Sequence, residues 1–160
     1  MTDYQVFISF KNNDSNGNHT RDYHMAYALY TYLVGKGIRV FFSEETLEKL
    51  GDSDYKAAID AALDVVSVMV VVGTSAENLN SKWVKHEWDS FHQDILSDYK
   101  DGEIFSYLSG VDVHTLPRSL RYLQAVMHNE EDPSVSLAKL YNFVKNSLGI
   151  EDDSEAEKIR

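Results

Sequence analysis

Glu87 is the residue of this chain best placed to do chemistry. It follows Trp83 by one helical turn in the segment Ser-Lys-Trp-Val-Lys-His-Glu-Trp, residues 81–88, so both side chains project from the same side of a predicted helix. Just upstream, the valine-rich run 65–72 indicates a buried strand that ends at Gly73, Thr74 and Ser75. A glutamate on a helix after such a strand can overlook the carboxyl end of a parallel sheet, where ligands bind in open α/β folds.

The composition excludes several classes of function. At 160 residues, 43% of them hydrophobic, the chain suits one domain with a single core. The formal net charge of −11 disfavours a large nucleic-acid footprint or a polybasic membrane contact. The absence of cysteine excludes thiol catalysis, disulfides and cysteine-ligated zinc, and it fits a cytoplasmic protein. We also expect no secretory signal at the amino terminus, and no apolar run is long enough to form a membrane-spanning helix.

Other catalytic patterns do not fit the sequence. His86 and His92 stand six residues apart, whereas the His-Glu-x-x-His zinc pattern needs histidines four apart on one helical face. Neither the Gly-x-Gly-x-x-Gly pattern nor the Gly-Lys-Ser phosphate loop occurs. Ser9, Thr74 and Ser75 have no histidine placed to activate them, which disfavours a serine or threonine nucleophile. We therefore expect neither a metal site nor a bound cofactor.

Apolar segments alternate with amphipathic ones, which predicts βαβ units and a doubly wound α/β fold with a parallel sheet. Strands are predicted at residues 4–10, 38–42, 66–72, 104–108 and, at an edge, within 120–126. Helices are predicted at residues 23–34, from a cap at Asp52 or Ser53 through Leu63, at about 82–98 and at 133–148. We expect residues 1–149 to form the domain and residues 150–160 to form a polar, flexible tail.

The predicted helix at 82–98 carries an apolar stripe that should face the core. Its members are Val84, Trp88, Phe91, Ile95 and Tyr99. Trp83 and Glu87 lie beside this stripe rather than on it.

Five motifs, in the right order, resemble those of the TIR domain, the Toll and interleukin-receptor signalling module. The opening strand at 4–10 is the first, and the second runs from Val40 through Glu45, Leu47 and Gly51, resembling the family's BB loop. Later positions that fit are Ile59, Ala62, the valine-rich strand, Ser75, Ser81, Trp83, Glu87, Trp88, Leu116, Pro117 and Leu120. The resemblance covers about residues 4–148. It implies a flavodoxin-like sheet of about five mainly parallel strands, with a crevice between strands one and three.

TIR domains that act as enzymes cleave NAD+ at its nicotinamide–ribose bond, and the resemblance maps their catalytic glutamate to Glu87. The implied product is ADP-ribose if water captures the ribose, or a cyclic isomer if a ribose hydroxyl or the adenine does. One carboxylate suffices in principle, because nicotinamide leaves as a neutral ring and only an oxocarbenium-like state needs stabilising. The implied setting is bacterial antiphage signalling, in which a separate effector senses the product.

Substrate-binding residues should lie at the carboxyl ends of the first three strands. We expect them to be Ser9, Phe10, Lys11, Phe42, Ser43, Gly73 and Thr74, with Trp83 bracing the helix or the pocket wall. Phe10 or Phe42 could stack on a base, and core packing is an equally good interpretation of both. Lys11 could meet a phosphate or could be an ordinary solvated charge.

The charged loop at 43–51 suggests a partner surface. It contains Glu45, Leu47, Leu50 and Gly51, and in the TIR family such loops dock onto a neighbouring subunit. The alternative function is a non-catalytic homotypic interaction module, in which Glu87 is structural. A third candidate function is that of a deoxyribosyltransferase-like enzyme, which also uses a glutamate on ribose. The loop motif disfavours this candidate. We expect no nucleic-acid or membrane partner.

Overall fold

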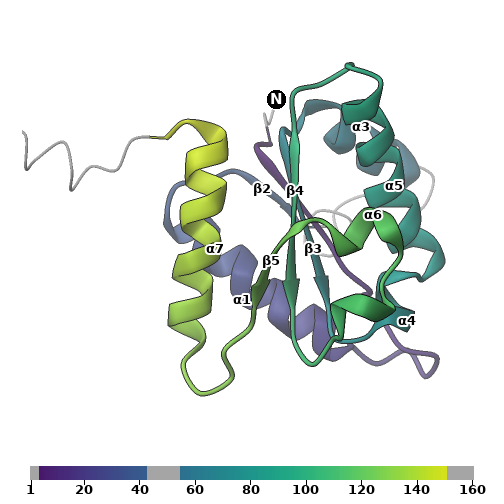
Figure 1. Ribbon diagram of the computed structural model, residues 1–160, viewed down its shortest axis with the longest axis vertical. Coiled ribbons are helices and arrows are strands. Elements are labelled where there is room, and N and C mark those ends of the chain that lie inside the picture. Colours follow the sequence, from purple (N-terminus) through teal and green to yellow (C-terminus); the bar gives the residue numbers. More distant parts are fainter. Residues whose placement is uncertain (1–3, 43–54, 151–160) are drawn as a thin grey trace, which may run out of the picture.

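The computed structural model describes residues 4–42 and 55–150 (Figure 1). Within them, five strands form one sheet in the order β2-β1-β3-β4-β5, and each neighbouring pair is parallel. They are β1 (Val6–Ser9), β2 (Val40–Phe42), β3 (Val68–Gly73), β4 (Glu103–Leu108) and β5 (Gln124–Met127). The strand order reverses between β1 and β3, which is the switch point of a flavodoxin-like sheet. The predicted fold class is confirmed.

Helices cover both faces of this sheet (Figure 1). On one face lie α1 (Arg21–Gly35) and α7 (Pro133–Leu148). On the other lie α3 (Tyr55–Val65), α4 (Ala76–Leu79), α5 (Lys82–Leu96) and α6 (Arg118–Arg121), with the short 3-10 helix η2 (Val113–Thr115) before α6. No helix in the described part of the chain combines the length and apolar character needed to cross a membrane.

The central strand β3 shows why the sheet needs two helical layers. Val68, Val70 and Val72 belong to the core on the α1 side, whereas Met69 and Val71 belong to the core on the α5 side. Successive side chains of a strand point to opposite faces, so a strand that is apolar throughout must be covered twice. The prediction of a central strand buried on both faces is confirmed.

The connection from β3 to α5 brings that helix close to the sheet. Gly73 ends β3, and a Cβ atom at this position would lie 2.5 Å from Cγ of Leu79. Ser75 then caps α4, its side chain accepting a hydrogen bond from the backbone N–H of Asn78 at 3.1 Å. The buried ring of Trp88 donates from Nε1 to the carbonyl of Leu79 at 2.9 Å. These contacts fix the first turns of α5 over β1 and β3.

The edge strand predicted within 120–126 is confirmed as β5, which begins at Gln124 and lies at the end of the sheet. Residues 118–121, just before it, form α6, whose Leu120 packs into the core. Neither α6 nor the other four-residue helix, α4, was predicted. A helix of four residues is too short to show the periodicity on which such a prediction depends.

The apolar stripe of α5 is shorter than predicted. The helix ends at Leu96, and Asp98 adopts a left-handed φ of 60°. Tyr99 therefore lies beyond the helix and is 85% exposed. By contrast, the predicted bounds of α7 are confirmed. The loop at 43–51, the helix cap predicted at 52 or 53, and residues 151–160 of the predicted tail at 150–160 lie outside the described residues.

Candidate active site

Glu87 is a buried carboxyl group on α5. The residue is only 6% exposed. Its Oε1 accepts a 2.7 Å hydrogen bond from Oγ of Ser9, the last residue of β1. Burial raises the pKa of Glu87 to about 8, and the Ser9 hydrogen bond, which favours the charged form, opposes this only in part. The carboxyl group of the free protein is therefore mostly protonated at neutral pH.

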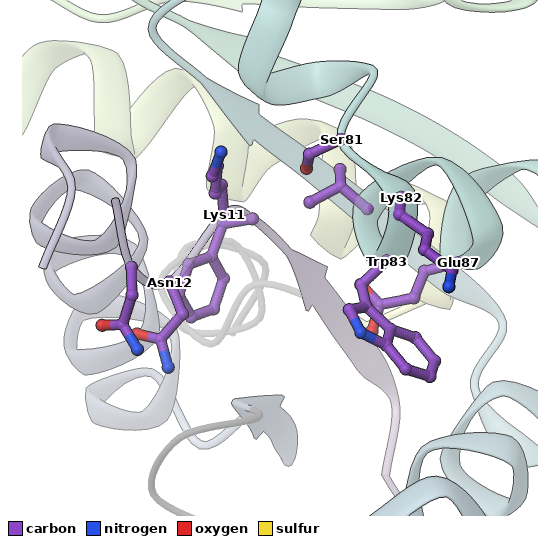
Figure 2. Close-up of a pocket in the computed structure, with 9 residues that line it drawn as sticks. Lys11, Asn12, Ser81, Lys82, Trp83 and Glu87 are labelled. Atoms are coloured by element: carbon purple, nitrogen blue, oxygen red, sulfur yellow. The ribbon is translucent and has the colours of Figure 1, made fainter. Parts of the chain in front are cut away.

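A pocket of about 210 Å³ opens beside Glu87 (Figure 2). It is lined by Phe10, Lys11, Asn12, Asn13, Ser81, Lys82, Trp83, Val84 and Glu87. Figure 2 shows Lys11 and Asn12, which follow β1, on one side, and Lys82, Trp83 and Glu87 of α5 on the other. Trp83 is 47% exposed, so an apolar ring and a buried carboxyl group share one wall of the pocket.

Four residues that the sequence placed in the site line this pocket: Phe10, Lys11, Trp83 and Glu87. Ser9 is not among the lining residues, and it contacts Glu87 from below the pocket through the hydrogen bond described above. Sequence spacing put Trp83 and Glu87 on one side of the helix, and the structure gives them opposite environments. The tryptophan ring is half-exposed, whereas the glutamate is in the interior.

Three other expected site residues lie behind the pocket rather than in its lining. Phe42 is fully buried and stacks on Phe10, with ring centroids 4.9 Å apart. Gly73 makes room for Leu79, and the Thr74 hydroxyl donates a hydrogen bond to the carboxylate of Asp22. The remaining expected residues, Ser43, Glu45, Leu47, Leu50 and Gly51, lie outside the described residues.

The family described as TIR domain matches residues 6–140 of this chain. This chain belongs to the TIR domain family. No curated protein sequence matches it.

In this TIR domain a second buried carboxyl group holds the site's framework together. Asp22, in the first turn of α1, is fully buried, and its Oδ1 accepts hydrogen bonds from Thr74 Oγ1 and, at 3.2 Å, from Asn78 Nδ2. The helix N-terminus stabilises a negative charge at this position. The cluster ties α1 to the connection between β3 and α4. Sequence reasoning missed it, because the predicted helix started at residue 23, one position too late to mark Asp22 as a first-turn acid.

Sequence reasoning also missed Asn12 and Lys82, both of which line the pocket of the TIR domain. The Oδ1 atom of Asn12 is buried and has no hydrogen-bond partner. Lys82 is the first residue of α5. The one available signal was their position, since each is the immediate neighbour of an expected site residue, Lys11 or Trp83.

Proposed function

We propose that this TIR domain cleaves NAD+ at the bond between nicotinamide and ribose, with Glu87 as the catalytic carboxylate. The observation that carries this proposal is a buried carboxyl group held by Ser9 at the wall of a pocket. Burying an ionisable group destabilises a fold unless its charge is compensated. Strongly perturbed carboxyl groups in clefts are therefore candidates for functional groups rather than packing groups.

In this reaction the protein mainly has to position the substrate and stabilise the charge that develops on the ribose. The bond from ribose C1′ to the pyridinium nitrogen breaks, and its electron pair leaves with nicotinamide, which departs as a neutral molecule. The ribose is left with oxocarbenium character, which a fixed carboxylate stabilises. Water then adds at C1′ and loses a proton, giving ADP-ribose. Attack by a ribose hydroxyl or the adenine instead gives a cyclic isomer.

The ionised form of Glu87 is the one that stabilises this cation. Burial favours the protonated form in the free protein, but a pyridinium ring in the pocket brings a positive charge that lowers the carboxyl pKa. We therefore expect substrate binding to release the proton of Glu87. The half-exposed ring of Trp83 offers a face that attracts the same cationic ring.

We also propose that the loop at 43–51 docks onto a second copy of the chain and completes the site. We further propose that a separate effector in the cytoplasm senses the product. The described pocket, at about 210 Å³, is smaller than the roughly 300–1,000 Å³ typical of sites for drug-sized ligands. A dinucleotide therefore needs a further surface. If the domain served only homotypic interaction, Glu87 would act through its hydrogen bond with Ser9, which joins α5 to β1, and Glu87→Gln would leave that function intact.

The test is nicotinamide release from NAD+ by concentrated purified protein, with the products separated by chromatography. We expect Glu87→Gln to lower the rate at least about a hundredfold, the scale seen when one preorganised electrostatic group is removed. Asp89→Asn is the matched control, because it makes the same change on the exposed face of α5 and should leave the rate unchanged. A folded Glu87→Gln protein as active as the parent would refute the assignment.

A further inference from the structure

We infer that the pocket selects a nicotinamide nucleotide over the corresponding nucleoside by holding its 5′-phosphate with Lys11 and Lys82. This inference rests on the proposed function, because it names the part of the substrate that the same site recognises beyond the bond that is cleaved. Nicotinamide mononucleotide is then the smallest ligand with all the groups that the described pocket can hold.

Two ammonium groups border one small pocket in a strongly acidic protein. The sequence has 15 lysines and arginines against 26 aspartates and glutamates. Within the described residues, neither Lys11 nor Lys82 forms an ion pair with a carboxylate, so both charges are available to an anionic ligand. Lys11 follows β1 and Lys82 opens α5, so they come from opposite sides of the pocket (Figure 2).

The residues that line the pocket can receive the nicotinamide mononucleotide half of the substrate. If the pyridinium ring lies against Trp83 and ribose C1′ lies near Glu87, both groups occupy the wall formed by α5. The 5′ carbon and its phosphate then extend away from that wall. Lys82 is exposed and Lys11 is partly exposed, so each long side chain is able to turn toward a phosphate in the pocket.

Asn12 offers a partner for the sugar. Its Oδ1 atom is buried without a hydrogen-bond partner, and the residue lines the pocket. A buried acceptor without a donor is unfavourable, so binding of the sugar is expected to turn the amide toward the pocket, where a ribose hydroxyl donates to Oδ1. The pocket therefore presents an aromatic ring, a sugar acceptor and two cations, which together match a ring, a ribose and a phosphate.

Binding to the Glu87→Gln protein tests the inference without cleavage. Nicotinamide mononucleotide and nicotinamide riboside are each titrated calorimetrically, at low and at physiological salt. Hydrogen bonds between charged groups are stronger than neutral ones, so we expect the mononucleotide to bind at least about tenfold more tightly. Adding Lys11→Ala or Lys82→Ala should remove most of this difference. Lys85→Ala is the control, since it removes the same charge from an exposed position on α5 outside the pocket lining.

Three results would overturn the inference: no measurable binding of the mononucleotide, equal affinity for both ligands, or a difference that survives in both pocket variants. A loss of the same size in Lys85→Ala would also overturn it, because it would show a general effect of charge. None of these results concerns cleavage. The proposed function fails separately, if Glu87→Gln still releases nicotinamide from NAD+.

Discussion

The carboxyl group of Glu87 destabilises the folded state whenever it is ionised, because burial removes the charge from water. The folded protein keeps this proton up to a pH of about 8, whereas the unfolded chain releases it near the ordinary value of 4.5. Between these pH values the folded state binds more protons than the unfolded state. The contribution of Glu87 to stability therefore falls as pH rises through this window and levels off above pH 8.

Glu87→Gln should remove this pH dependence, since the amide does not ionise and can still accept the hydrogen bond from Ser9. We expect the variant to match the parent near pH 4.5 and to be more stable above pH 8. The difference in free energy of unfolding should reach the order of 5 kcal/mol. Urea unfolding of both proteins at the two pH values measures it. A difference that does not grow with pH would mean that the carboxyl group is better solvated than its 6% exposure indicates.

At the scale of elements, the site depends on how closely the chain turns from β3 into α4. The hydrogen at Gly73 faces the side chain of Leu79, which is 1% exposed and packed in the core beneath α5. Trp88 then bonds to the carbonyl of the same leucine. A displacement of Leu79 therefore reaches the helix that carries Glu87.

Gly73→Ala should destabilise the protein by about 1–3 kcal/mol, the usual cost of overpacking a core. It should also lower activity, because the added methyl group must displace Leu79. Gly35→Ala is the control: a Cβ there meets nothing within 4 Å, and the residue is the last of α1. Chemical denaturation and nicotinamide release are measured for both variants. If Gly73→Ala unfolds like Gly35→Ala, the close approach of Leu79 does not constrain this connection.

Long elements were predictable from the sequence, whereas the shortest helices were not. The β3 run of valines and the periodic helix α7 were predictable, because each carries its pattern over many residues. The short helices α4 and α6 were not. In the site, Glu87 followed from motif order, whereas the Asp22–Thr74 bond joins residues 52 positions apart. Such contacts depend on the final packing of α1 against β3, which no local pattern encodes.

At the scale of the whole molecule, net charge and self-association oppose each other. The chain carries a formal charge of −11, so two copies repel each other at low ionic strength. Screening over about 8 Å at physiological salt weakens this repulsion. If the loop at 43–51 completes the site of a neighbouring copy, activity must depend on protein concentration.

We expect specific activity to rise with protein concentration, more steeply at physiological than at low salt. Leu50→Glu should abolish the rise, because it places a charge in a loop proposed to dock through its leucines. Lys85→Glu makes a larger charge change in the same direction, at an exposed position of α5 outside the pocket lining. This variant should keep the rise of specific activity with protein concentration. Activity is assayed across a wide dilution series. A flat series that Leu50→Glu does not alter would show that each monomer carries a complete site.

The pH dependence of kcat/KM for NAD+ cleavage tests the central claim most directly, because it reports ionisation of the free protein. Glu87 must be ionised to stabilise the ribose cation, and its pKa in the free protein is about 8. We predict that kcat/KM rises about tenfold per pH unit below this value and becomes constant above it. A rate that falls as pH rises through 8, or one that is flat from about pH 6 to 9, would contradict the catalytic role of the Glu87 carboxylate.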